Sequence, residues 1–81
     1  MKMILNITQK HIDSGIRKDC TNCPVAVLLK EMGHKYVGVS YGWLQFGKFK
    51  ANIAHTELSE FIMSYDKGEN VKPLETEITV V

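Results

Sequence analysis

Two cysteines and a proline stand at the start of the best-defined helical segment, in the run Cys20-Thr21-Asn22-Cys23-Pro24. Proline is tolerated at the first position of a helix, because its missing N–H has no intrahelical partner there. Pro24 is therefore predicted as the first helical residue and Cys23 as the N-cap. Both sulfurs then lie in the positive field of a helix N-terminus, which favours the thiolate over the thiol.

This Cys-x-x-Cys pair has three interpretations: a redox pair, half of a metal site, or a tight connection between a loop and a helix. A thioredoxin-like motif begins its helix at the first cysteine directly after a strand, whereas here Cys23 is the cap and a short helix precedes it. A structural zinc site needs four ligands; if zinc binds, Cys20, Cys23 and His11 are the candidate ligands. We expect instead that both thiols are reduced and structural, with no metal and no cofactor.

The chain of 81 residues is predicted to form a single α+β domain over residues 1–81. A core of this size leaves a thin margin of stability, which a second copy of the chain would improve. Apolar residues remain after each helix has buried one stripe, notably Val27, Ile53 and Met63. They predict self-association into a homo-oligomer.

A formal net charge of +1 gives no strong attraction to nucleic acid or to an anionic membrane. The apolar run at residues 1–6 is too short for a signal peptide, and no window approaches the roughly 18 apolar residues of a membrane span. We therefore expect a cytoplasmic protein that binds no membrane and no nucleic acid. In that compartment the two cysteines would stay reduced.

Three segments have helical patterns. Thr8 can cap a short helix over residues 9–14, which Gly15 ends. The other two segments carry apolar residues at positions i, i+3, i+4 and i+7 and stop at a glycine. These residues are Val25, Leu28, Leu29 and Met32 before Gly33, and Leu58, Phe61, Ile62 and Tyr65 after a Thr56 cap and before Gly68.

Residues 1–7 and 74–80 alternate between apolar and polar positions, which is typical of strands with one buried face. Residues 36–46 are rich in strand formers, and Gly47-Lys48 predicts a two-residue hairpin turn into residues 50–53. The resulting order is β-α-α-β-β-α-β. It predicts an α+β two-layer sandwich, with helices packed on an antiparallel or mixed four-stranded sheet.

The central hairpin is the predicted binding surface, because its aromatic rings are interleaved with lysines. The candidate ligand-binding or partner-binding residues are Tyr36, Tyr41, Trp43, Phe46, Lys48 and Lys50. Aromatic rings on a sheet beside lysines suit the stacking of bases, although core packing competes for the same rings. Trp43 is the predicted exposed anchor, since tryptophan is enriched at interface hot spots. No nucleophile with an adjacent base and no phosphate-binding glycine loop is found, so we expect no enzymatic activity.

The chain also carries the pattern HIxxG…CxxCPxA…FIxxYDxGxxVxP, which covers most of its length apart from the central hairpin. The pattern is formed by His11, Ile12, Gly15, Cys20, Cys23, Pro24, Ala26, Phe61, Ile62, Tyr65, Asp66, Gly68, Val71 and Pro73. It resembles a group of small uncharacterised proteins encoded in tailed-phage and prophage genomes. The resemblance implies a phage accessory protein expressed in the cytoplasm of a host bacterium.

Small phage proteins of this kind bind and block a host protein or sequester a nucleotide signal used in host defence. The resemblance therefore implies a non-enzymatic accessory protein with a host protein or a nucleotide-type small ligand as its partner, and an anti-defence role. The alternative is a Cys-x-x-Cys-anchored module that binds zinc or nucleic acid.

Overall fold

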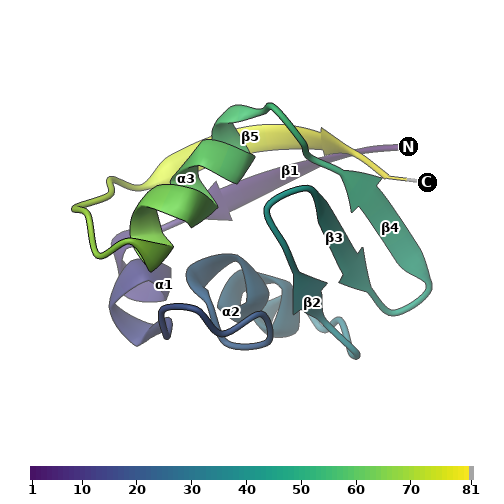
Figure 1. Ribbon diagram of the computed structural model, residues 1–81. Coiled ribbons are helices and arrows are strands. Elements are labelled where there is room, and N and C mark those ends of the chain that lie inside the picture. Colours follow the sequence, from purple (N-terminus) through teal and green to yellow (C-terminus); the bar gives the residue numbers. More distant parts are fainter. Residues whose placement is uncertain (81) are drawn as a thin grey trace.

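The first and last strands of the chain pair with each other, so the two ends lie side by side (Figure 1). In this computed structural model, which describes residues 1–80, eight helices and strands follow one another. They are β1 (Lys2–Ile7), α1 (Gln9–Ser14), α2 (Pro24–Glu31), β2 (Gly38–Val39), β3 (Trp43–Phe46), β4 (Phe49–Asn52), α3 (Glu57–Asp66) and β5 (Leu74–Thr79). The predicted α+β class is confirmed. No helix within the described residues is long and apolar enough to cross a membrane.

The strands form two antiparallel sheets, β1-β5 and β2-β3-β4, so the prediction of one antiparallel or mixed four-stranded sheet is only partly matched. The antiparallel pairing is confirmed, but the strands are divided between two sheets. The predicted order also lacks one strand, because residues 36–46 contain two strands rather than one. The chain reverses between Val39 and Trp43, and β2 then pairs with β3, with Val39 opposite Leu44. An isolated bridge between Ala51 and Val80 connects the two sheets.

The predicted hairpin turn joins β3 to β4. Phe46 lies opposite Phe49, which leaves Gly47 and Lys48 as the two turn residues. Gly47 has a φ of +60°, in the left-handed region that suits glycine at the first position of such a turn. The turn N–H of Gly47 donates to the carbonyl oxygen of Lys35, which holds the segment before β2 against the hairpin.

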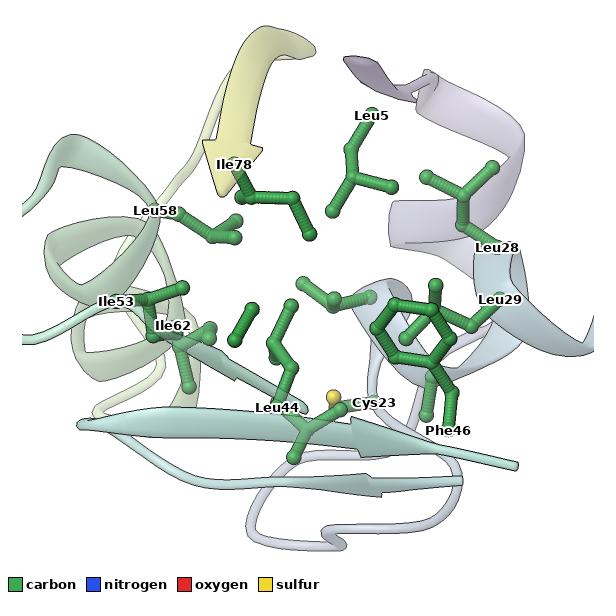
Figure 2. Close-up of a cluster of buried hydrophobic side chains, with 14 of the residues drawn as sticks. Leu5, Cys23, Leu28, Leu29, Leu44, Phe46, Ile53, Leu58, Ile62 and Ile78 are labelled. Atoms are coloured by element: carbon green, nitrogen blue, oxygen red, sulfur yellow. The ribbon is translucent and has the colours of Figure 1, made fainter. Parts of the chain in front are cut away.

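The core fills the space between the two sheets and the longer helices (Figure 2). Leu5 and Ile7 face it from β1, as the predicted alternation requires, and the predicted apolar stripe of α3 is buried. The stripe of α2 is buried except for Met32, which follows the last helical residue and is 46% exposed. The burial of such side chains supplies the main stabilisation of a domain this small.

One expectation about apolar surface needs correction. Ile53 is buried in the core, so it is not left over for contact with a second copy. The reason is that Ile53 continues the alternation of β4, two residues after the buried Ala51, which directs its side chain to the core. Val27 and Met63 are half-buried, so part of each side chain lies at the surface. Self-association of the chain stays a prediction, with Val27 and Met63 but not Ile53 as its basis.

Gly15 lies where α1 approaches the start of α2. Its φ of −73° is accessible to any residue, so the backbone conformation does not require glycine. The constraint is space, since a Cβ at Gly15 would lie 2.6 Å from Cδ and 2.7 Å from the backbone nitrogen of Pro24. These distances are too short for nonbonded atoms, and the rigid proline ring cannot move aside. The close approach thus sets how α1 and the first turn of α2 pack together.

We expect Gly15→Ala to lower the free energy of unfolding by about 1–3 kcal/mol, the usual cost of overpacking. Denaturant unfolding of both proteins would measure the difference. Gly42→Ala is the matched control, because a Cβ at Gly42 meets no atom within 4 Å and its φ is not in the left-handed region. Equal stability of the two variants would contradict the packing role of Gly15.

Candidate functional site

A cleft of about 310 Å³ opens between the Cys-x-x-Cys loop, the turn from β2 to β3 and the C-terminal end of α3. We call it the thiol cleft. It is lined by Lys18, Asp19, Cys20, Cys23, Val39, Ser40, Tyr41, Trp43, Ile62 and Asp66. The fold therefore brings the two cysteines together with Tyr41 and Trp43 of the predicted binding surface in the lining of one cavity.

The Asp19 carboxylate organises the loop that carries the cysteines. It accepts hydrogen bonds from the backbone N–H of Thr21 at 3.0 Å, from the Thr21 hydroxyl at 2.9 Å and from the Asn22 side-chain amide at 3.1 Å. These bonds, the one from the Asn22 side chain above all, lower the pKa of Asp19. The carbonyl oxygen of Cys20 in turn accepts from the N–H of Val39 at 2.9 Å, which attaches the loop to β2.

The two thiols have different environments. Cys20 is exposed, whereas Cys23 is 4% exposed and contributes its sulfur to the core beside Leu44 (Figure 2). Cys23 is the N-cap of α2 and Pro24 its first residue, as predicted. The expectation of a favoured thiolate is wrong for Cys23, because desolvation raises its pKa and outweighs the opposing effect of the Ala26 and Val25 N–H groups.

Asp66, the last residue of α3, connects the two walls of the thiol cleft. Its Oδ1 accepts from the backbone N–H of Lys18 at 2.9 Å, and its Oδ2 accepts from the Tyr41 hydroxyl at 2.9 Å. The hydrogen bond to Asp66 raises the pKa of Tyr41. The Ser59 hydroxyl also donates to the carbonyl oxygen of Tyr41, so α3 holds the turn from β2 to β3 at two points.

Trp43 lies at the boundary between the thiol cleft and the outside of the three-stranded sheet, and it is 49% exposed, as the anchor prediction requires. Alternation along β3 and β4 places Trp43, Gln45, Lys50 and Asn52 on the same outer sheet face. Trp43 lines two further hollows on this face, one with Gln45 and Lys50 and one with Lys50 and Asn52. The indole lies against Gly38, where a Cβ would be 3.6 Å from Cζ3 of Trp43, an ordinary van der Waals contact.

The other predicted hairpin residues are distributed differently. Phe46 is wrong as a binding residue, because it points to the inner side of the sheet, is 1% exposed and packs edge-on with the ring of His34 at 4.7 Å between centroids. Tyr36 is 85% exposed, and Lys48 is exposed in the hairpin turn. Neither residue lines the thiol cleft or the hollows beside Trp43.

The candidate zinc ligands are not brought together. His11 is buried in α1, where its Nδ1 accepts from the backbone N–H of Thr8 at 2.9 Å and its Nε2 lies 3.1 Å from a carboxylate oxygen of Glu31. Both ring nitrogens thus have partners away from the cysteines. Within residues 1–80, no group of three or more His, Cys, Asp or Glu side chains has a geometry that could hold a metal ion.

Sequence reasoning did not include Lys18, Gln45, Asn52 or Asp66 among the binding residues, although Asp66 belongs to the resemblance pattern. Period-two alternation with Leu44 and Ala51 was a signal for Gln45 and Asn52, because it places both residues on the same face of the predicted hairpin as Trp43. Asp66 had no comparable signal, since its partners are 25 and 48 residues away along the chain.

Comparison of the chain with protein-family models, curated proteins and solved structures finds no match. The resemblance to phage-encoded proteins therefore stays a prediction. The residues of that pattern make several contacts around the Cys-x-x-Cys loop: the Tyr65 hydroxyl donates to the carbonyl oxygen of Ile12 at 3.0 Å, and Asp66 binds the loop at Lys18. These contacts are structural and do not identify a ligand.

The Tyr41–Asp66 bond predicts a specific pH dependence. The pKa of Tyr41 is raised above its ordinary value of 10.0, so the stabilising effect of the neutral phenol is fully present below that value and is lost as the pH rises through the folded-state pKa. In Asp66→Asn the Tyr41 phenol should titrate at lower pH, because the negative acceptor is gone. Absorbance titrations would show this, with Tyr41→Phe identifying the Tyr41 component. An unchanged titration in Asp66→Asn would contradict the assignment.

Proposed function

We propose that the chain is a non-enzymatic binding protein whose ligand is of the nucleotide type, with its base stacked on Trp43. The main support for this proposal is the half-exposed indole of Trp43. It lies on the outer sheet face, where the neighbouring side chains of β3 and β4 are polar, so these two strands offer the ring no apolar partner on that face. Stacking on an aromatic ring contributes about 1–3 kcal/mol for each base. Trp43 is also the only tryptophan in the chain.

Charge supports an anionic ligand. The segment from Met32 to Thr56, which contains the whole three-stranded sheet, carries Lys35, Lys48 and Lys50 but no Asp or Glu. Lys50 lines both hollows beside Trp43. A lysine in this position would suit a phosphate attached to a stacked base. The net charge of +1 of the whole chain conceals this local excess of positive charge.

Two amide side chains supply hydrogen-bonding capacity next to the indole. Asn52 lies directly opposite Trp43, and Gln45 lies two residues along the same strand and opposite Lys50. The Gln45 amide offers both donors and an acceptor, which suits the edge of a purine or pyrimidine. The Asn52 amide offers its two N–H donors, since its Oδ1 already accepts from the backbone N–H of Ala54 at 3.0 Å. The outer sheet face therefore combines stacking, edge recognition and a cation for phosphate.

In the phage setting that the resemblance implies, such a protein would sequester a nucleotide signal in the host cytoplasm and so act against host defence. An exposed tryptophan also suits a hot spot for a host protein, and the wide exposure of Tyr36 favours that second candidate. The two candidates differ in salt dependence, since phosphate recognition by lysine weakens as ionic strength rises.

A panel of adenine and guanine nucleotides, added to the reduced protein, tests the proposal. At least one nucleotide should quench the emission of Trp43 and bind less tightly as salt is added. By calorimetry, Trp43→Ala should weaken binding by about 1–3 kcal/mol, and Lys50→Gln should reduce both the affinity and its salt dependence.

Tyr36→Ala is the matched control, because it removes an exposed aromatic ring that lines neither hollow beside Trp43. Its nucleotide affinity should equal that of the original protein. Absence of binding across the panel, or equal losses in Tyr36→Ala and Trp43→Ala, would rule out the nucleotide site and leave a host protein as the candidate partner.

A further inference from the structure

The Cys-x-x-Cys loop is itself folded as a helical turn. The N–H groups of Asn22 and Cys23 both donate to the carbonyl oxygen of Asp19, at 3.3 and 3.0 Å. These are the hydrogen bonds of a single helical turn, which ends at Cys23, where the extended backbone (ψ 169°) leads into α2. Residues three apart in such a turn lie on the same face, with Cβ atoms about 5–6 Å apart. Cys20 and Cys23 are therefore neighbours across the turn, within a small adjustment of the spacing that a disulfide needs.

The same turn gives the two sulfurs unequal access. Both cysteines line the thiol cleft, but Cys20 is exposed whereas Cys23 is almost entirely buried. An incoming reagent can reach the sulfur of Cys20 from solvent. It cannot reach the sulfur of Cys23 directly, although Cys20 itself lies close to it. This difference in solvent access to the two sulfurs determines which cysteine reacts first in a two-step exchange with a disulfide.

We infer that Cys20 and Cys23 form a dithiol site that undergoes exchange with small disulfides such as oxidised glutathione, Cys20 reacting first and Cys23 second. This chemistry goes beyond the proposed ligand binding and does not depend on it. The Asp19 hydrogen bonds hold the turn in place, so the two sulfurs stay neighbours throughout the reaction.

In the first step the Cys20 thiolate attacks one sulfur of the small disulfide. A bond forms between the Cys20 sulfur and that sulfur, the original disulfide bond breaks, and one thiolate leaves and takes up a proton. In the second step the Cys23 thiol gives up its proton to solvent and attacks the Cys20 sulfur, which releases the second thiol. The two cysteines are oxidised to a disulfide, and the small disulfide is reduced to two thiols.

The cleft suits this substrate class. Its apolar walls, Val39, Ile62 and Trp43, lie beside the sulfurs and can receive the half of the reagent that stays attached to Cys20. Lys18 lies in the same lining and offers a positive charge to a carboxylate of glutathione. Burial raises the pKa of Cys23, which favours its neutral thiol and is consistent with Cys20 reacting first.

The test is reaction of the reduced protein with oxidised glutathione, followed by acid quenching and intact-mass measurement. The original protein should lose two hydrogens and carry no lasting adduct. Cys23→Ser should accumulate one glutathione on Cys20, because no second thiol is present to displace it. Cys20→Ser should stay unmodified over the same period, because the sulfur of Cys23 is buried. Serine is a preferred N-cap residue, so Cys23→Ser keeps a suitable start for α2.

A second measurement does not require either variant to fold. Peptide mapping of the original protein, quenched early, should find the glutathione adduct on Cys20 and not on Cys23. Overturning results are a stable glutathione adduct on the original protein, equal modification of the two cysteines, or no loss of hydrogens at any glutathione ratio. Nucleotide binding is measured on the reduced protein, whereas disulfide exchange is measured with oxidised glutathione. The proposed nucleotide site and the proposed dithiol site can therefore fail independently of each other.

Discussion

The contact between Gly15 and Pro24 is the constraint on which the functional region depends. It brings the end of α1 against the start of α2, so the eight residues between them must form a surface loop. A loop that is short and closed at both ends has little conformational freedom, and Asp19 accepts several hydrogen bonds within it. This closure and the burial of Cys23 in the core together fix the positions of the two cysteines.

Asp66 connects that loop to the rest of the site. Its two oxygens bind the loop backbone and the Tyr41 hydroxyl, so the end of α3 holds both walls of the thiol cleft. Trp43 belongs to the cleft and to the outer sheet face at once. Chemistry at the cysteines and ligand binding on the sheet would therefore take place on either side of one indole ring, supported by the same helix.

Much of the local structure was predictable from residue pattern. Pro24 after Cys23, Thr56 before an acidic first turn and Gly47 at a two-residue turn each have a local physical cause that acts over a few residues. The exposure of Trp43 was also predicted correctly. The burial of Phe46 was not, although Trp43 and Phe46 are three residues apart in β3 and therefore lie on opposite faces of the sheet. Only packing against the core decides which of the two faces is buried.

Sequence alone thus established the α+β class, the helix boundaries and the presence of a thiol pair at a helix start, because these depend on neighbouring residues. The division into two sheets, the burial of Cys23 and the position of Asp66 between the loop and Tyr41 depend on contacts between residues far apart in the chain. Desolvation of Cys23 is the clearest case. The helix N-terminus indicated a thiolate, but the core that surrounds the sulfur favours the neutral thiol, and that core exists only in the folded chain.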